Sequence, residues 1–273
     1  MLKNVRIVFS KTDRAKYVSH LDLMRTMTRA FRRAQIPLWY TEGFNRHPYL
    51  TFAAPLSLGH EGLRETVDIR LEEDMPMDEV VARLNGALPQ GIVAIEAAEA
   101  VDKVKELVAA EYTITIRCAA EKVTALLAQN EILVEKRTKK KTMKTIDIKP
   151  YFADAVVTEA GEGTCVMEVT LPSGSAENVN PGLFLTALSA FVGAEIKAEF
   201  LRKRLLKADG TEFVGLGETH GTIGFEEQGS NGFGYDCIFI SDDLGVSFGL
   251  ASDEDKNKVS HRYRGLVDLL GKL

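Results

Sequence analysis

Four arginines near the start of the chain give the sequence its most distinctive chemistry. At about 100° per residue they fall on one face of an amphipathic helix, opposite its apolar side chains. Guanidinium groups bind phosphates or carboxylates bidentately, so this face is a candidate anion- or RNA-binding surface. A solvated helix face is the alternative, because charged runs commonly face water. The four residues are Arg25, Arg29, Arg32 and Arg33.

A turn-rich loop with the sequence GFNRHP carries a second group of functional side chains. It contributes Phe44, Asn45, Arg46 and His47 as binding candidates, since loops held by rigid strands commonly carry binding groups. His47 is also a catalytic candidate, together with His20 at the first turn of the arginine helix. If the two histidines converge, they could do acid/base work like that of duplicated ferredoxin-like RNA endonucleases, by analogy of fold alone. A hydrogen-bonded, half-buried histidine is the alternative for His20.

A third group is a run of six cations within nine residues that contains no acid. Such a run repels itself unless an anion neutralises it, and a nucleic-acid backbone is the obvious anion. Binding of that kind would weaken as salt rises. A solvated loop between two strands is the alternative. The cations are Lys136, Arg137, Lys139, Lys140, Lys141 and Lys144.

The elements that must position these groups repeat one order. Alternating and helical hydrophobic patterns predict a β-α-β-β-α-β series in the first hundred residues. Ser19, with Asp22 three residues later, is the expected N-cap of the arginine helix. The expected segments are strand 3–9, helix 19–35, strands 36–43 and 64–72, helix 78–88 and strand 91–100. A second series follows with strand 111–118, helix 121–130, strands 132–136, 145–157 and 164–171, helix 181–192 and strand 194–206.

These series predict an α+β fold with two tandem ferredoxin-like units and a short C-terminal α/β appendage. The expected domains are 1–100, 111–206 and 208–273, and residues 97–110 form a connection or a short helix. The charge supports the last boundary. The chain has 273 residues and a formal charge of −5, yet residues 208–273 hold 5 Lys+Arg against 12 Asp+Glu, while the rest holds 29 against 27. The two regions are therefore expected to have different partners.

Composition and cysteine spacing exclude several classes of protein. Hydrophobic residues make up 45% and charged residues 27%, which is ordinary for a globular protein and unlike a disordered or fibrous one. No apolar run reaches the length of a membrane span and the first residues do not resemble a signal peptide, so we expect a cytoplasmic protein without a membrane partner. Cys118, Cys165 and Cys237 stand singly, so no metal site and no iron–sulfur cluster is predicted.

Residues 17–62, from YVSHLDLMR through GFNRHP to LSLGHEG, together with RETVDI and LNGALPQGI, resemble the bacterial radical-SAM-linked protein family of unknown function. The resemblance covers about residues 1–206, with Arg46 where that family usually has a second proline. It implies a radical SAM protein as a partner. The cluster chemistry would belong to that partner, because this chain has no cluster-binding cysteine motif.

The C-terminal region carries chemistry of another kind. A glycine-dense turn, GSNGFGYD, presents an aromatic ring and a carboxylate, and the string DKNKVSHR starts an expected helix. Both strings closely resemble the C-terminal part of the inosine triphosphate pyrophosphatase family, with Cys237 where that family usually has a proline. The resemblance implies that Phe233 stacks a purine base, that Gly234, Tyr235 and Asp236 shape the base pocket, and that Lys256, Ser260, His261 and Arg262 contact the purine edge.

The rest of that family's site is missing from residues 1–206. Neither the family's T-x-N-x-x-K phosphate-binding segment nor its acidic motif occurs there. Pyrophosphate hydrolysis needs Mg²⁺, which would be a cofactor only if the chain hydrolyses nucleotides, and Mg²⁺ needs carboxylate ligands. The sequence therefore favours an accessory protein that binds RNA or a radical SAM partner and is not a complete enzyme by itself. The alternative is a purine triphosphate pyrophosphatase, or a non-catalytic remnant of one.

Overall fold

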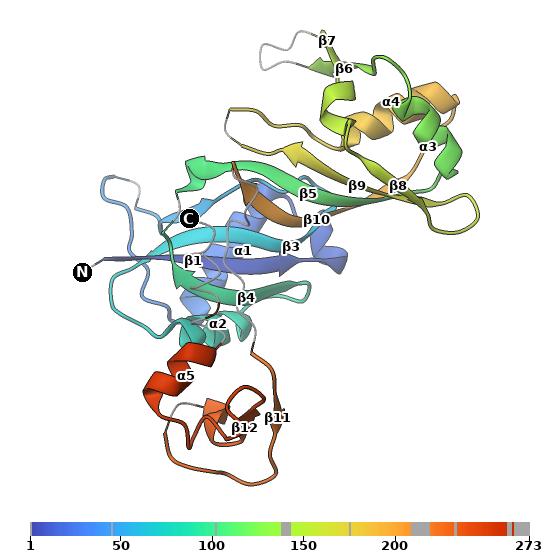
Figure 1. Ribbon diagram of the computed structural model, residues 1–273. Coiled ribbons are helices and arrows are strands. Elements are labelled where there is room, and N and C mark those ends of the chain that lie inside the picture. Colours follow the sequence, from blue (N-terminus) through green and yellow to red (C-terminus); the bar gives the residue numbers. More distant parts are fainter. Residues whose placement is uncertain are drawn as a thin grey trace. The chain divides into compact units, whose positions relative to one another are not determined.

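The computed structural model describes residues 2–44, 46–101, 103–137, 143–174, 176–208, 219–231, 234–260 and 264. The chain forms two compact units, Met1–Gly210 and Thr211–Leu273 (Figure 1). Helices and strands both contribute substantially, which confirms the α+β class.

The first unit is built on one mixed sheet. Among the described residues the sheet has eight strands in the order β4-β1-β3-β10-β5-β9-β8, with β2 paired beside β3. A separate hairpin of β6 and β7 lies off this sheet. The main strands are β1 Lys3–Lys11, β2 Leu50–Phe52, β3 His60–Leu71, β4 Ile92–Glu99, β5 Leu107–Ile116, β8 Val156–Glu159, β9 Cys165–Pro172 and β10 Ala198–Lys207, and the hairpin strands are β6 Leu133–Arg137 and β7 Met143–Asp147.

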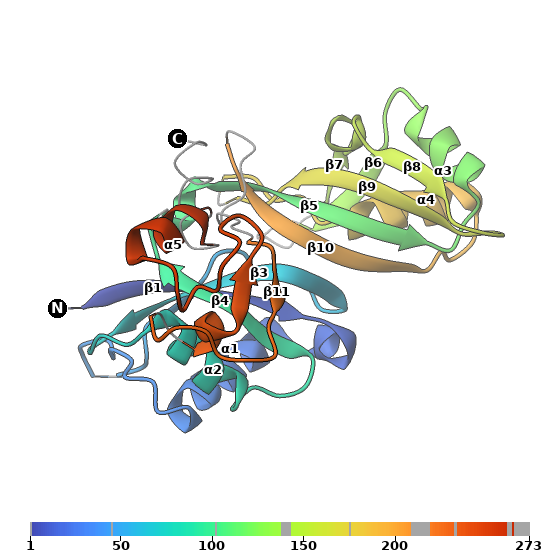
Figure 2. The ribbon, with the colours of Figure 1, turned by 60° about the horizontal axis from the view of Figure 1, so that its bottom comes forward.

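Four α-helices and three 3₁₀ turns connect these strands in the described part of the first unit. They are α1 His20–Arg33, α2 Met77–Asn85, α3 Ala120–Leu127 and α4 Gly182–Val192, with η1 Asp13–Tyr17, η2 Val104–Glu106 and η3 Lys149–Phe152. α1 begins as expected, because the Ser19 hydroxyl accepts a hydrogen bond from the backbone N–H of Asp22. Its apolar stripe, including Met27 and Phe31, packs with α2 on residues of β1 and β3 to form one core. α1 and α2 therefore cover the same face of this part of the sheet (Figure 2).

Two of the expected strands were wrong. Residues 36–43 form only isolated bridges, from Leu38 to Leu71 and from Tyr40 to Pro48, and the second strand is β2 further along the chain. Pro37 has no N–H to donate to a continuous ladder. The expected strand 145–157 is divided into β7, η3 and β8, with a proline in the first turn of η3. The ferredoxin-like assignment of each half stays a prediction.

The two halves of the first unit join along a parallel contact between β3 and β10. Phe200 lies opposite His60 and Arg202 opposite Gly62. The guanidinium of Arg202 donates two hydrogen bonds to the carboxylate of Glu65, from Nε to Oε1 at 2.8 Å and from Nη2 to Oε2 at 2.5 Å. Gly62 leaves room for this pair, since a Cβ there would collide with the carboxylate of Glu65.

The described part of the second unit buries few apolar side chains. Its described elements are β11 Gly221–Ile223, η4 Gly234–Cys237, β12 Phe239–Ser241 and α5 Asp253–Val259, and β11 pairs with β12. Within its described residues, the only buried apolar side chains are Phe248 and Ala251.

The joining contact between β3 and β10 gives a stability prediction. Glu65→Gln removes the charge that compensates the buried guanidinium of Arg202, so the free energy of unfolding should fall by about 3–5 kcal/mol. Urea denaturation checks this. Asp74→Asn is the control, because the ion pair of Asp74 with Lys3 is exposed and should leave stability nearly unchanged. Equal effects of the two substitutions would contradict the role given to Glu65.

Candidate functional site

A cluster of charged side chains lies inside the first unit, and no sequence pattern singled it out. Lys11 at the end of β1, Glu65 on β3 and Arg202 on β10 are each 3% exposed or less, and His60 at the start of β3 is buried beside them. Lysine, glutamate and arginine are almost never fully buried unless they are paired. Glu65 forms an ion pair with Arg202. The cluster therefore contains two basic side chains, Lys11 and Arg202, but one carboxylate.

The cluster disfavours further positive charge. Lys11 donates to the backbone carbonyl of Lys16 at 3.2 Å, and burial lowers the pKa of its ammonium. The ring of His60 stacks on Phe200, with ring centroids 4.4 Å apart. Burial, followed by the charges of Arg202 and Lys11, lowers the pKa of His60 to about 4. The imidazole is therefore neutral at physiological pH.

The two catalytic candidates have different neighbours. His20 is half-buried and its ring contacts Phe52 edge-on at 5.3 Å, while burial and the charge of Lys11 lower its pKa. His47 is exposed, and its Nδ1 lies 3.2 Å from the hydroxyl oxygen of Thr41. Joint acid/base work by the two histidines stays a prediction.

The arginine face is exposed along α1, as expected. Arg25 pairs with Asp22 at 3.0 Å, and Nε of Arg32 donates to the hydroxyl of Tyr40 at 3.3 Å. Arg33 donates to the carbonyl of Ala87, just beyond α2. Arg29 is exposed as well. The four residues are therefore exposed, but the fold holds their guanidinium groups to different degrees.

The loop after α1 brings aromatic rings close to positive charge. Phe44 is fully exposed, Arg46 is exposed, and Asn45 lies outside the described residues. At the base of the loop, the guanidinium of Arg70 lies 5.2 Å from the ring of Trp39 and 4.5 Å from that of Tyr49. These are cation–π contacts, which hold the start and end of the loop on β3.

The lysine run is carried by the β6–β7 hairpin. Lys136 and Lys144 are direct partners across its ladder, and both are exposed. Lys136 also donates to the carbonyl of Asn178 at 3.5 Å. The side chain of Arg137 and the residues Lys139, Lys140 and Lys141 lie outside what the structure describes. Like charges directly opposite each other destabilise a strand pair, so this position favours an anion.

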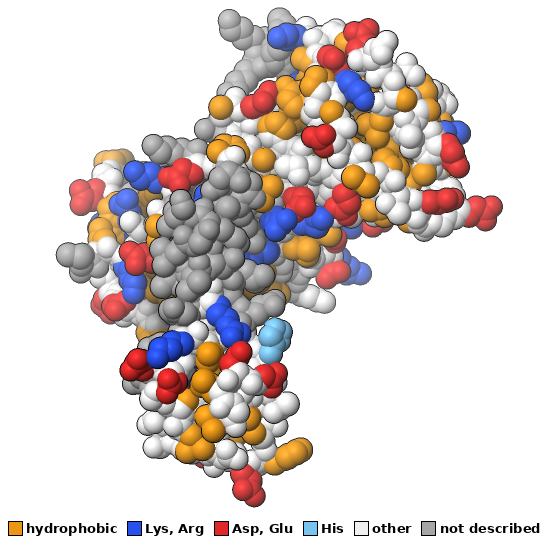
Figure 3. Space-filling view, viewed as in Figure 1, with side chains coloured by type: hydrophobic (Ala, Val, Ile, Leu, Met, Phe, Trp, Pro, Cys, Tyr) orange, Lys and Arg blue, Asp and Glu red, His pale blue; other side chains and the backbone are white. Residues whose placement is uncertain are grey.

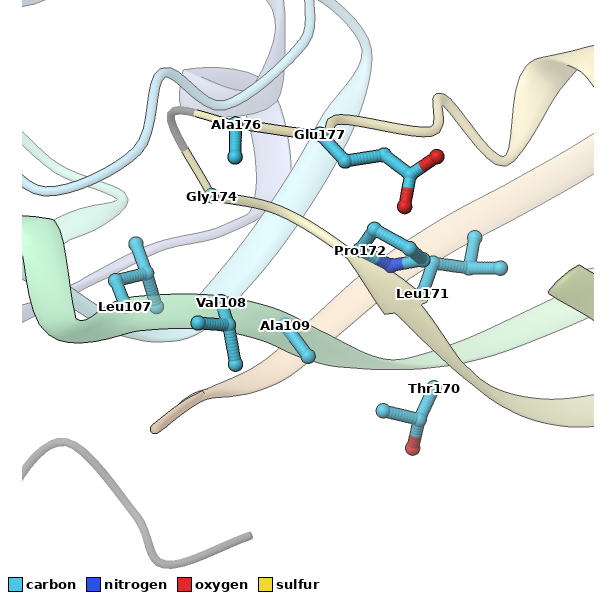
Figure 4. Close-up of a pocket in the computed structure, with 9 residues that line it drawn as sticks. All are labelled: Leu107, Val108, Ala109, Thr170, Leu171, Pro172, Gly174, Ala176 and Glu177. Atoms are coloured by element: carbon cyan, nitrogen blue, oxygen red, sulfur yellow. The ribbon is translucent and has the colours of Figure 1, made fainter. Parts of the chain in front are cut away.

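Neither of two shallow pockets gathers the predicted residues. One, of about 380 Å³, lies beside the start of β5 and the end of β9 and is mostly apolar, with the carboxylate of Glu177 at its rim (Figure 4). That carboxylate accepts a hydrogen bond from the hydroxyl of Tyr151 at 2.6 Å. The other, of about 510 Å³, lies where α1 and α2 end and includes Arg33.

In the second unit the fold brings together the two strings that suggested a purine site. Lys256 on α5 forms an ion pair with Asp236 in η4, and its ammonium lies 5.8 Å from the ring of Phe248. Ser260 is buried and its N–H donates to the carbonyl of Lys256 at 2.9 Å, while Tyr235 is exposed. Gly234 starts η4, and Phe233, His261 and Arg262 lie outside the described residues.

The described residues do not fit a magnesium ion. In the described part of the chain, no three histidines, cysteines or carboxylates gather to hold a metal. The carboxylate of Asp236 is engaged by an ammonium, which opposes a second cation at the same oxygens.

A family model decides where the first unit belongs. The family described as "Uncharacterized protein conserved in bacteria (DUF2344)" matches residues 4–181, about two thirds of the chain. This chain belongs to the DUF2344 family. The match covers α1, the loop after it and the β6–β7 hairpin, so the candidate surfaces of the first unit are part of the DUF2344 region.

The C-terminal part of this DUF2344 protein matches a second family. The Ham1 family matches residues 176–272. The dITP/XTP pyrophosphatase of Haemophilus influenzae is 45% identical over 65 residues, 24% of this chain and 33% of that protein. The enzyme of the same name from Methanosarcina mazei is 50% identical over 54 residues, 20% of this chain and 28% of that protein. The chain thus spans about a third of the curated relatives it matches.

Solved structures add little to these matches. The crystal structure of a Cbf5-Nop10-Gar1 complex is similar over 74% of this chain and 48% of the other, with a TM-score of 0.41 and 11% identity. A score this low does not establish a shared fold. Within the described residues, no helix is both long and apolar enough to cross a bilayer.

The buried histidine of this DUF2344 protein gives a pH prediction. The fold lowers the pKa of His60 from 6.5 to about 4, so the unfolded chain takes up a proton first as the pH falls. Stability should be full above about pH 6.5 and decline below it, with a loss of about 2 kcal/mol from this residue near pH 4.5.

His60→Phe keeps a ring against Phe200 but cannot titrate, so the decline of stability should be shallower in this variant. Urea denaturation at a series of pH values between about 7.5 and 4.5 measures both slopes. Parallel curves for the variant and the unaltered protein would show that His60 is not the group responsible.

Proposed function

We propose that this DUF2344 protein is an accessory protein that binds RNA through its basic surfaces and acts beside a radical SAM partner. One observation carries the RNA part: Lys136 and Lys144 face each other across a hairpin that stands apart from the main sheet. The radical SAM partner rests on the sequence resemblance alone.

The charge of the hairpin supports a polyanion as its ligand. Side chains directly opposite in an antiparallel pair have Cβ atoms only about 4.5–5.5 Å apart, so the two ammoniums repel each other. The five residues that connect β6 to β7 add three more lysines and no acid. A phosphate backbone relieves this repulsion and releases counterions when it binds.

The arginine face and the loop after α1 support RNA further. Arg29 and Arg32 present guanidiniums to solvent, and Phe44 presents a fully exposed ring in the neighbouring loop. Exposed aromatic rings next to basic residues are typical of surfaces that stack the bases of single strands. The first unit thus offers groups for phosphates and for bases.

Salt dependence tests the RNA proposal. The double variant Lys136→Ala/Lys144→Ala should bind transfer RNA more weakly, and the slope of log K against log salt should fall by about 1 for each phosphate that the variant no longer neutralises. Fluorescence anisotropy between about 50 and 200 mM salt measures the slope. Lys3→Ala is the control, because Asp74 already neutralises Lys3. Absence of binding, or binding that does not depend on the salt concentration, would contradict the proposal.

A second candidate function is purine nucleotide binding by the second unit. The ion pair of Lys256 with Asp236 favours it, because this contact joins the two strings that resemble the inosine triphosphate pyrophosphatase family. The Ham1 match over the same region and the similarity to dITP/XTP pyrophosphatases support a purine nucleotide as the ligand. Hydrolysis by this chain alone has less support, since the described carboxylates do not fit Mg²⁺.

Two lysines on one helix provide a matched test of nucleotide binding. Lys256→Met should weaken binding of inosine triphosphate about tenfold or more, because it removes a charged group from the proposed site. Lys258→Met should have no effect, since Lys258 pairs with Glu254 on the exposed face of α5. Equilibrium dialysis measures binding, and pyrophosphate release in the same samples measures turnover. Equal binding by both variants would rule out this site.

A further inference from the structure

A pocket at the ends of two helices of the first unit is lined by a pair of arginines. The pocket, of about 510 Å³, lies where α1 and α2 end, and Arg33, Gln35 and Arg83 are among the residues that line it. This volume is within the range of about 300–1,000 Å³ that is common for small-ligand sites. The arginine face expected from the sequence includes Arg33 but neither Gln35 nor Arg83, so the pocket adds two residues to it.

The two arginines are held by contacts that cross from one helix to the other. Arg33, the last residue of α1, donates from Nη2 to the carbonyl of Ala87, beyond α2, at 2.5 Å. Arg83, in the last turn of α2, donates from Nη1 to the carbonyl of Gln35, beyond α1, at 3.5 Å. A guanidinium has five N–H donors, so these bonds orient both groups and leave donors for a ligand. Two oriented guanidiniums are suited to the oxygens of a phosphate.

The charges at this pocket favour an anion. Basic and acidic side chains lie next to one another on the face drawn in Figure 3, and surface pairs such as Lys203 with Glu168, 2.6 Å apart, cancel in charge. At the pocket, Arg83 forms such a pair with Glu79, one turn earlier on α2, whereas Arg33 contacts a neutral carbonyl. Two guanidiniums and one carboxylate leave one positive charge, which matches the single negative charge of a phosphodiester.

The backbone at the end of α1 is strained at a residue of this pocket. The N–H of Ile36 donates to the carbonyl of Phe31 at 3.2 Å and that of Gln35 to the carbonyl of Arg32 at 3.1 Å, which is a Schellman motif. The motif puts Gln35 in the left-handed region, with a φ of 53°. Glycine is usual at this position because a Cβ is unfavourable there. Since Gln35 is exposed, packing of its side chain does not explain the strain, and a role in binding does.

We propose that this pocket binds one phosphodiester group of an RNA strand. Arg33 and Arg83 donate to the phosphate oxygens, and the side-chain amide of Gln35 donates a further hydrogen bond to the same group. The pocket is larger than a phosphate, so it also admits the attached ribose. This inference rests on the RNA binding proposed above and adds to it a fixed phosphate site at the end of the arginine face.

Two substitutions separate charge from hydrogen bonding. Arg83→Gln should weaken binding about tenfold and lower the slope of log K against log salt by about 1, because one charged phosphate contact is lost. Gln35→Gly should weaken binding about threefold or more without changing that slope, because the amide carries no charge. Fluorescence anisotropy of the full-length protein with a short, labelled, single-stranded oligoribonucleotide measures both quantities.

Matched controls are available in the second half of the first unit. Gln129→Gly removes an exposed glutamine just after α3, and Arg117→Gln removes an exposed arginine that pairs with Glu199 at 3.5 Å. Both variants should bind as the unaltered protein does. Urea denaturation is the control for folding. Gln35→Gly should not lower the midpoint, because glycine adopts the left-handed conformation without strain.

Several outcomes would overturn the proposal, and they separate it from RNA binding as such. If Gln35→Gly and Arg83→Gln bind like the unaltered protein, this site is wrong while RNA binding by the β6–β7 hairpin stands. If Gln35→Gly binds more weakly and also has a lower urea midpoint, Gln35 serves the fold. If inorganic phosphate displaces the oligonucleotide at an equal concentration, the ligand is free phosphate. If the unaltered protein does not bind the oligonucleotide, RNA binding fails and this site fails with it.

Discussion

The ion pair between Arg202 and Glu65 fixes how the first unit is assembled. A guanidinium and a carboxylate that are both removed from water must meet with good geometry, because the cost of leaving either alone is several kcal/mol. Here that requirement sets the register at which β10, from the end of the unit, lies against β3, from its beginning. Gly62 is part of the same constraint, since any side chain there would displace the carboxylate of Glu65. One eight-stranded sheet in the described residues, in place of two separate sheets, follows from this contact.

The same pair determines the chemistry of its surroundings. Because Arg202 takes the one carboxylate of the cluster, Lys11 and His60 are left in a buried region with excess positive charge. Burial and neighbouring positive charge both disfavour the protonated form of such groups, and the pKa values of Lys11 and His60 are lowered accordingly. Exposed cations of the first unit lie instead on its hairpin and on α1. Anion binding belongs to those exposed surfaces, where charge is retained at little cost.

How much of this the sequence could predict depends on the range of the interaction. The helix 19–35 was predictable because Ser19, Asp22 and the spacing of Leu23, Met27 and Phe31 act within a few residues. The exposure of the four arginines followed from the same periodicity. The cluster around Arg202 was not predictable, because Glu65 is 137 residues away in the chain and nothing near either residue signals the partner. The available signal was a lysine, Lys11, directly after the apolar strand expected at residues 3–9. The sequence does not show that this lysine is buried, because its burial depends on tertiary contacts. The segment 36–43 failed for a local reason, the missing N–H of Pro37.

The described parts of the two units differ in how they are stabilised, which argues for different roles. The first unit closes its own core, with α1 and α2 packed on β1 and β3 and a charged cluster fully enclosed. Its surfaces are consequently available for a ligand without being needed for folding. The described part of the second unit has a short strand pair and two buried apolar residues. In those described residues, the ion pair of Lys256 with Asp236 joins α5 to η4, so this contact serves the fold of the second unit as well as the proposed nucleotide site.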